Sequence, residues 1–120
     1  MTALLEARDL ARIWYLWLRN GSWNGTQIVT PEWVRESVTP AMRVAETQGA
    51  PSYGFKWWLY LNPVDTTKWV WSGSGFGGQS PMAIAELDLI VVFNGWNILP
   101  GRGGLPRNRV LERIIRATSR

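Results

Sequence analysis

The sequence predicts an α+β protein in which helices from the two ends of the chain pack on an antiparallel sheet of three or four strands. Three observations support this fold class. Apolar residues recur with helical spacing near the N-terminus and again near the C-terminus. Between them, from residue 53 to residue 93, the pattern changes to the alternation that is typical of strands. The connections between these strands are short, which favours antiparallel neighbours.

Two helices are expected in the first half of the chain. The first covers residues 10–18, and its apolar stripe follows the i, i+3, i+4, i+7, i+8 spacing with Leu10, Ile13, Trp14, Trp17 and Leu18. Asn20-Gly21 ends this helix, and residues 21–25 are expected to form a turn. The second helix begins at Thr30 as N-cap, has Pro31 at its first position, and ends before Thr39-Pro40. Residues 41–51 are expected to form a loop or a broken helix.

Four strands and a last helix are expected in the second half. The strands cover residues 53–61, 68–72, 79–85 and 87–93, and the third is the weakest because Pro81 suggests an edge or a bulge. Asn62-Pro63 begins a turn after the first strand. Residues 73–78 are rich in glycine, and we expect unusual backbone angles there. The last helix covers residues 108–118.

Length and composition limit the possible classes of protein. The 120 residues fit one domain, 1–120, with a helical segment at 1–50, antiparallel strands at 51–97 and a C-terminal helix at 98–120. The chain has no Cys and no His, so no thiolate metal site and no His-dependent catalytic triad can form within it, and no metal or cofactor is expected. Apolar runs such as residues 89–93 are far shorter than the about 20 residues of a membrane span. No signal peptide is expected, and the compartment cannot be predicted.

The net charge of +4 is concentrated at the C-terminus. Residues 98–120 contain six Arg and one Glu. One interpretation is a patch that binds nucleic acid or another anionic surface. The solvated face of a helix is the interpretation we favour, because the basic residues are not interleaved with aromatic ones. A nucleic-acid partner is therefore not expected.

Nine tryptophans are unusual for a chain of this length. They are either stacking platforms for a ligand or the filling of a core or buried interface. Several lie on periodic apolar faces, so the core interpretation is favoured. A Trp-rich binding or protein-interaction module remains the alternative function. The tryptophans are Trp14, Trp17, Trp23, Trp33, Trp57, Trp58, Trp69, Trp71 and Trp96.

The most distinctive segment is the glycine-rich stretch at residues 71–79, Trp-Ser-Gly-Ser-Gly-Phe-Gly-Gly-Gln. It does not match the P-loop, which ends in Gly-Lys-Ser/Thr. It does not match Gly-x-Ser-x-Gly either, because that motif needs a glycine two residues before the serine. Val70 stands two residues before Ser72, and Ser72 stands two residues before Ser74. On its own, this stretch is also compatible with a tight connection between two strands.

The order of the segments carries more information than any one of them. Ala-Arg-Asp-Leu-Ala-Arg at 7–12 precedes Asn-Gly-Ser-Trp-Asn-Gly at 20–25 and Thr-Pro-Glu-Trp-Val at 30–34. Tyr-Gly-Phe-Lys-Trp-Trp-Leu at 53–59, Gly-Phe-Gly-Gly-Gln at 75–79 and Glu-Leu-Asp-Leu-Ile-Val-Val at 86–92 follow. From about Ala7 to Ile115 this order resembles the C-terminal part of the serine β-lactamase-like hydrolases, the superfamily of class C β-lactamases, penicillin-binding proteins and esterases.

This resemblance implies an antiparallel sheet flanked by helices and acyl transfer through a serine of a Ser-x-x-Lys motif. That motif is absent here, because neither Lys56 nor Lys68 has a serine three residues before it. Tyr60-Leu-Asn has the letters of the family's Tyr-x-Asn element, but its place in the order is wrong and the match is interpreted as chance. We therefore expect a hydrolase part that is inactive alone, with no catalytic residue.

The resemblance also implies where a ligand would bind. Trp71-Ser72-Gly73 stands where the family has Lys-Thr-Gly, so an indole replaces the cation. The backbone N–H after that glycine, which is Ser74 here, corresponds to an oxyanion-hole donor. The implied ligand is an acyl or β-lactam-like small molecule, and a homo-oligomer or a complementing chain is the expected partner. The candidate binding residues are Trp71, Ser72, Gly73, Ser74, Gly75, Gly78 and Gln79.

Overall fold

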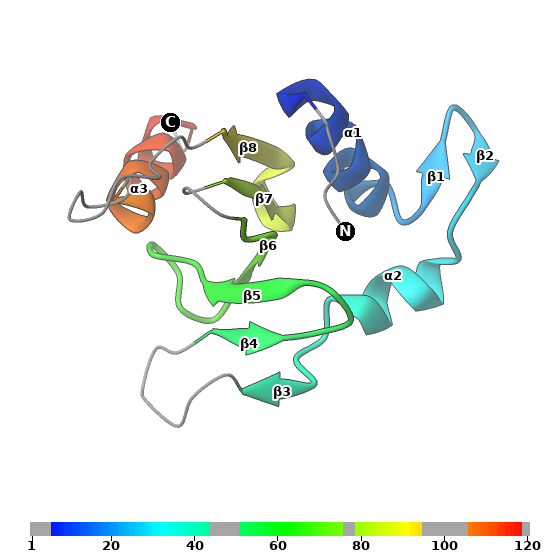
Figure 1. Ribbon diagram of the computed structural model, residues 1–120, viewed down its shortest axis with the longest axis horizontal. Helices are drawn as coiled ribbons and strands as arrows, with labels where there is room; N and C mark the ends of the chain where they lie inside the picture. Colours follow the sequence, from blue (N-terminus) through cyan, green and yellow to red (C-terminus); the bar gives the residue numbers. More distant parts are fainter. Residues whose placement is uncertain (1–5, 44–50, 76–78, 95–105, 119–120) are drawn as a thin grey trace.

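The computed structural model describes residues 6–43, 51–75, 79–94 and 106–118. Three helices and eight strands are formed in this part of the chain (Figure 1). In chain order they are α1 (Ala7–Leu18), β1 (Ser22–Trp23), β2 (Thr26–Gln27), α2 (Pro31–Ser37), β3 (Met42–Arg43), β4 (Ser52–Tyr53), β5 (Trp58–Leu61), β6 (Trp69–Ser72), β7 (Ser80–Ile84), β8 (Leu89–Phe93) and α3 (Arg107–Thr118).

The α+β class is confirmed, but the sheet has more strands than predicted. Strands β3 to β8 form one antiparallel sheet of six strands in chain order, and β1 and β2 form a separate hairpin. The hairpin replaces the simple turn expected at residues 21–25, and Asn24 and Gly25 at its tip both have positive φ. Strand β3 pairs with β4 where a loop or a broken helix was expected.

The predicted strand at residues 53–61 is in fact two strands joined by a tight turn. The Gly54 N–H donates to the Trp57 carbonyl over 2.9 Å, and Lys56 adopts a φ of 70°. The alternation of apolar residues suggested one continuous strand because Phe55, which lies in the turn, continued the pattern. The strand predicted from residue 87 begins instead at Leu89, after a short 3-10 turn at Ala85–Leu87.

Local sequence signals explain where the helices begin. In α1, the Glu6 and Asp9 side chains bond reciprocally to the backbone in a capping box. In α2, the Thr30 hydroxyl accepts a hydrogen bond from the Trp33 N–H, and Pro31 occupies the first helical position. The predicted second helix therefore has the expected start.

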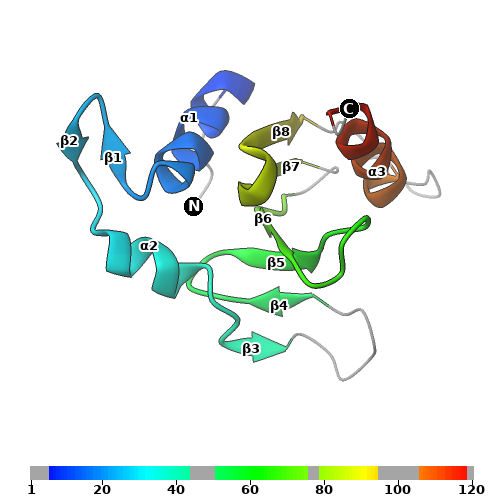
Figure 2. The same ribbon diagram turned by 180° about the vertical axis from the view of Figure 1, so that it is seen from behind.

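The core has two parts, on opposite faces of the sheet. Because side chains alternate along strands, Val70 and Met82 face α3, where they pack with Leu111 and Ile115. On the other face Trp57 and Leu59 pack with Val38 and with half-buried tryptophans of α1 and β6. Figures 1 and 2 show α3 on one side of β6 to β8 and α1 on the other.

Strand β8 is an edge strand, and its pairing with β7 determines which of its backbone N–H groups face outward. The Pro81 carbonyl accepts from the Gly73 N–H, so the backbone groups of Pro81 point toward β6. Pro81 is opposite Val92 in the register, and the groups of Met82 therefore point toward Val91. It follows that the N–H groups of Ile90 and Val92 point away from the sheet.

None of the helices within the described residues is both long and apolar enough to span a membrane.

Candidate functional site

The glycine-rich turn connects the end of β6 to the start of β7. Trp71 and Ser72 are the last residues of β6, Gly73, Ser74 and Gly75 follow it, and Gln79 directly precedes β7. Of the predicted binding residues, Gly78 lies outside the described residues. The structure therefore brings six of the seven together at one end of the sheet.

The backbone of Ser74 offers a free hydrogen-bond donor. The N–H groups of Gly73 and Gly75 donate across to β7, to Pro81 over 3.0 Å and to Gln79 over 2.9 Å. Since successive N–H groups of an extended chain point to opposite sides, the Ser74 N–H points away from β7 and toward the side of β5. Ser74 is exposed and makes no hydrogen bond within the described part of the chain.

This donor is free because β5 ends too early to pair with it. The last pair between β5 and β6 joins Trp58 to Ser72. Before Trp58 the chain turns back toward β4, so none of the described strands lies beside Ser74 to accept its N–H. The position that the resemblance assigns to an oxyanion-hole donor is therefore an exposed amide with no partner in the part of the chain that the structure describes.

The hydroxyl of Ser72 is enclosed in the core. Its Oγ donates to the Gly73 carbonyl over 2.8 Å and lies 3.4 Å from the Ser80 Oγ and 3.3 Å from the Pro81 carbonyl. Ser72 is completely buried. These contacts hold the end of β6 and the start of β7 together, and a ligand at the surface cannot reach the Ser72 hydroxyl.

The glycines of this turn are required by close packing. A Cβ at Gly73 would lie 3.2 Å from the Trp14 ring and 3.2 Å from Pro81, and a Cβ at Gly75 would lie 2.7 Å from the Gln79 Oε1. Neither glycine has a positive φ, so the expectation of unusual backbone angles is wrong for these two. Close approach of neighbouring side chains is the reason instead.

The indole of Trp71 belongs to the core facing α1. Its side chain packs against the buried cluster around Trp57, and its carbonyl accepts a hydrogen bond from the Trp14 Nε1 over 2.9 Å. Where the resemblance places a lysine side chain in the family, this chain has a ring that holds α1 against the sheet.

A row of aromatic side chains lies on the opposite face of the sheet. Tyr53 and Trp58 are in edge contact at 5.1 Å between ring centroids, and Trp58 and Tyr60 are stacked at 6.5 Å. All three are half-buried, and the Arg107 guanidinium lies 3.7 Å from the centroid of the Tyr60 ring. Sequence reasoning missed this row, although the alternation of Trp58 and Tyr60 was a signal for one shared face.

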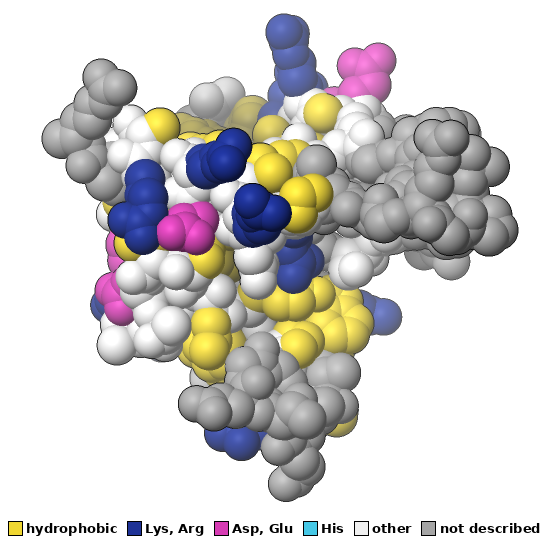
Figure 3. Space-filling view, turned by 90° about the vertical axis from the view of Figure 1, so that its left-hand side faces the viewer, with side chains coloured by type: hydrophobic (Ala, Val, Ile, Leu, Met, Phe, Trp, Pro, Cys, Tyr) yellow, Lys and Arg dark blue, Asp and Glu magenta, His cyan; other side chains and the backbone are white. Residues whose placement is uncertain are grey.

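The basic residues of the C-terminal helix have different partners. Arg116 pairs with Glu112 over 2.9 Å, and Arg107 covers Tyr60. Arg109 and Arg113 are exposed and form no ion pair within the described residues. In Figure 3 basic side chains gather beside hydrophobic ones on this side of the molecule. Arg102 and Arg120 lie outside the described residues.

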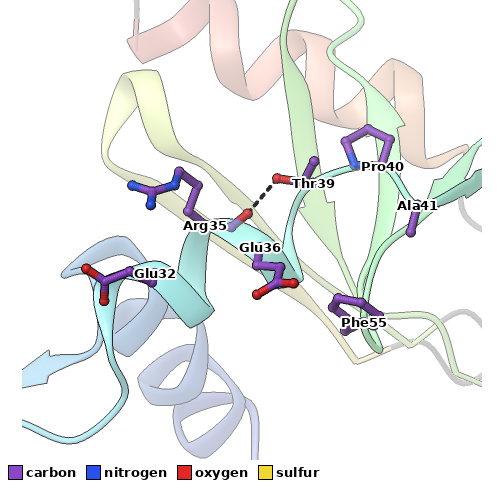
Figure 4. A pocket seen from close by; sticks show the side chains of 7 residues that line it. All are labelled: Glu32, Arg35, Glu36, Thr39, Pro40, Ala41 and Phe55. Atoms are coloured by element: carbon purple, nitrogen blue, oxygen red, sulfur yellow. Dashed lines mark hydrogen bonds between the residues drawn. The ribbon is translucent and has the colours of Figure 1, made fainter.

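A separate groove of about 520 Å³ lies between α2 and the β4–β5 turn (Figure 4). Phe55 contributes to it and stacks on Trp33, with the ring planes 9° apart. The Thr39 hydroxyl donates to the Arg35 carbonyl over 2.7 Å at the end of α2. The residues that line the groove are Glu32, Arg35, Glu36, Thr39, Pro40, Ala41 and Phe55.

Neither a metal site nor the carboxylate of Asp65 offers catalytic chemistry to the turn within the described residues. The described residues contain no cluster of three His, Cys, Asp or Glu side chains that could hold a metal ion. Hydrogen bonds from the Thr67 hydroxyl and N–H lower the pKa of Asp65, which makes this carboxylate a weaker base. Asp65 also lies in the β5–β6 turn, at the other end of the sheet from Ser74.

Comparison with known proteins gives a match in structure and none in sequence. No family model matches the chain, and no curated protein matches it. A solved structure described as "Putative 6-aminohexanoate-dimer hydrolase from Bacillus anthracis" matches with a TM-score of 0.65 and 23% sequence identity. The match covers 93% of this chain and 28% of the other, so this chain spans about a quarter of that protein. The chain thus shares the fold of the matching part of that structure.

Proposed function

We propose that this chain is the nucleophile-free C-terminal part of a serine β-lactamase-like amide or ester hydrolase. It would bind the carbonyl or carboxylate of an acyl ligand at the glycine-rich turn. The Ser74 N–H, which has no partner among the described residues, is the observation that carries the proposal, and the fold match to part of a solved hydrolase structure supports it.

The chemistry of this donor is binding, because the groups that would break a bond are missing. An N–H aimed at an acyl oxygen stabilises the negative charge that develops there during acyl transfer. Acylation also needs a nucleophile with a base within about 2.6–3.2 Å. The Ser72 hydroxyl is buried among carbonyl and hydroxyl oxygens, and Ser74 has no hydrogen-bonded base within the described residues.

A complete hydrolase would require residues beyond these 120. They would supply the serine and lysine of Ser-x-x-Lys and the tyrosine of Tyr-x-Asn, while the segment described here would supply the donor at Ser74. The isolated chain should therefore hydrolyse neither a chromogenic β-lactam nor a p-nitrophenyl ester above the uncatalysed rate.

The experiment measures hydrolysis and binding on the same preparation. Hydrolysis is followed by absorbance with the purified chain, and ligand contact is followed by the Ser74 amide signal in ¹⁵N-resolved NMR spectra. We expect no turnover and a saturable shift of Ser74 on addition of hexanamide. Turnover that disappears in Ser74→Ala would refute the inactive assignment, and a Ser74 signal that does not respond would refute the binding site.

A Trp-rich binding or protein-interaction module without hydrolytic activity is the second candidate. The half-exposed row of Tyr53, Trp58 and Tyr60 favours it, because aromatic faces stack on rings of many kinds. The same NMR titration distinguishes the two candidates. Shifts confined to the aromatic row, with Ser74 unaffected, would favour the binding module.

A further inference from the structure

The aromatic row lies on a part of the sheet that no described helix covers. Met42, Tyr53 and Trp58 are cross-strand partners on β3, β4 and β5, so their side chains share one face, and Tyr60 follows on that face two residues after Trp58. Val70, which is opposite Tyr60, packs against α3, so this is the face on which α3 lies. Figures 1 and 2 show α3 beside β6 to β8 and no described helix over β3 to β5 on this face. The row is therefore half-exposed, and Met42 is 64% exposed.

Arg107 connects this row to α3. Its guanidinium lies 3.7 Å from the centroid of the Tyr60 ring, in a cation–π contact. Within the described residues its N–H groups have no hydrogen-bond acceptor and no ion-pair partner. The contact therefore holds a cation at the end of the aromatic row and leaves its donors open to a ligand.

A groove of about 210 Å³ lies on the adjoining surface of α3. Pro106 and Val110 give it an apolar floor, and Arg109 and Arg113 stand one helical turn apart along it. Val110 follows Arg107 by three residues, so the two side chains are neighbours on the helix surface. The groove therefore continues from the flank of α3 that faces Tyr60.

The positive charge of this flank is not neutralised within the described residues. Glu112 is the only acid of α3, and it pairs with Arg116 over 2.9 Å. Arg109 and Arg113 are exposed and, like Arg107, form no ion pair in this part of the chain. Figure 3 views the molecule from the side on which α3 lies, and basic side chains there adjoin hydrophobic ones. A ligand that suits this surface carries both negative charge and flat apolar groups.

We propose that this surface binds single-stranded nucleic acid. Guanidinium groups match the oxygens of phosphate with a planar fork of donors, so the three arginines of α3 would contact the backbone of the strand. Unpaired bases would pack against the open parts of Tyr53 and Trp58, because aromatic side chains bind any base. The inference does not use the Ser74 donor. We call the surface the basic–aromatic face, and it consists of Tyr53, Trp58, Tyr60, Arg107, Arg109 and Arg113.

The tertiary structure removes the sequence argument against such a partner. That argument is that the basic residues of the C-terminus are not interleaved with aromatic ones along the chain. In the fold, Arg107 stacks on Tyr60, and the distance along the sequence between α3 and β5 is irrelevant. Basic and aromatic groups are neighbours in space, which is the arrangement that binds single strands.

The test measures binding of a labelled oligothymidylate of about twelve nucleotides by fluorescence anisotropy, a length within the site sizes of known single-strand binders. We expect a dissociation constant of about 1–100 μM at physiological salt, the range of non-specific nucleic-acid binding. A duplex of the same length should bind roughly fivefold more weakly, because its bases are stacked inside and cannot reach the aromatic row.

The arginines are tested by a double substitution and a matched control. Arg109→Gln/Arg113→Gln should weaken binding about tenfold, and the slope of log affinity against log salt should fall by about 1.4, which corresponds to two phosphate contacts on a single strand. The control, Arg8→Gln/Arg35→Gln, removes the same charge from exposed positions on α1 and α2 that form no ion pair within the described residues. It should change neither the affinity by more than about twofold nor the slope.

The aromatic row is tested separately from the charge. Trp58→Leu keeps an apolar side chain but removes the ring, so it should weaken binding roughly fivefold or more and leave the salt slope unchanged. A second measurement needs no variant. The indole N–H signal of Trp58 in NMR spectra of the unsubstituted chain should shift when the oligothymidylate is added.

Four results would overturn the proposal. The first is no binding of the oligothymidylate up to its solubility limit. The second is an equal loss of affinity in the test and control double variants, which would mean that net charge alone attracts the strand. The third is binding of the duplex or of polyglutamate as tightly as the single strand, which would indicate a general polyanion or acidic-protein surface. The fourth is a Trp58 signal that the oligothymidylate leaves unchanged.

Discussion

Gly54→Ala tests how the β4–β5 turn is held in place. A Cβ at Gly54 would overlap the Ser37 carbonyl oxygen and would lie 3.2 Å from the Thr39 carbonyl oxygen. Both obstacles are backbone atoms, so neither can rotate aside. The Ser37 carbonyl also accepts the Phe55 N–H, and that bond must lengthen if the turn moves. The substitution therefore separates the turn from the end of α2.

The expected cost is about 3 kcal/mol of unfolding free energy. Forcing a methyl group into packed surroundings costs about 1–3 kcal/mol, and an unsatisfied buried amide costs about 1–3 kcal/mol more. For a domain of this length the entropy of unfolding is about 0.25 kcal/mol per degree, so the midpoint of thermal unfolding should fall by about 12 °C. Circular dichroism during heating measures that midpoint.

Gly25→Ala is the matched control. A Cβ at Gly25 meets nothing within 4 Å, but the residue has a φ of 80°. The substitution therefore adds backbone strain without overlap, which costs about 1 kcal/mol and lowers the midpoint by about 4 °C. Equal midpoints for the two variants, or a Gly54→Ala protein within about 1 kcal/mol of the unsubstituted chain, would refute the steric argument.

Four further substitutions test other parts of the structure. Lys56→Gly should raise the free energy of unfolding by about 1 kcal/mol in urea denaturation, since glycine suits the positive φ. Ser72→Ala should lower it by about 1 kcal/mol through the loss of a buried hydrogen bond, and a larger effect on ligand binding than on stability would contradict its structural role. The hydrogen bonds from Thr67 hold the pKa of Asp65 below its ordinary value of 3.8, so their stabilising effect is complete above that pH and is lost as the pH falls through the lower folded pKa. The unsubstituted chain should therefore exceed Asp65→Asn in free energy of unfolding by less in acid than at neutral pH. A difference that grew in acid would contradict the assigned direction of the pKa shift. The outward-facing, uncharged edge of β8 predicts that the purified chain self-associates, which light scattering measures. Val92→Pro should abolish the association without unfolding the chain, because proline is tolerated where the replaced N–H faces solvent. A monomeric unsubstituted chain would contradict this prediction.

Periodicity and capping predicted the helices and the later strands. The apolar stripe of α1, the Thr30 cap and Pro31 of α2, and the β-branched residues of β8 each act locally, so the sequence carries their signal. The β4–β5 turn had no such signal. Its positive φ is at Lys56 rather than at a glycine, and Phe55 continued the alternation of a strand.

The candidate site was only partly predictable for a related reason. The resemblance indicated Ser74 as a donor, and the hydrogen bonds of Gly73 and Gly75 leave its N–H unpaired. The burial of the Ser72 hydroxyl depends on which face of β6 is covered by α3, a tertiary property that no local pattern encodes.

The contact of Trp57 with two indoles of α1 has an optical consequence. Its ring centroid lies 4.8 Å from that of Trp14 and 5.1 Å from that of Trp17, with the ring planes inclined at 63° and 41°. Indoles that are this close and are inclined to one another couple their electronic transitions, which gives a paired positive and negative band in circular dichroism. The amplitude of that couplet reports the docking of α1 on the sheet separately from the helix signal, so detachment of α1 could be observed while the sheet stays folded.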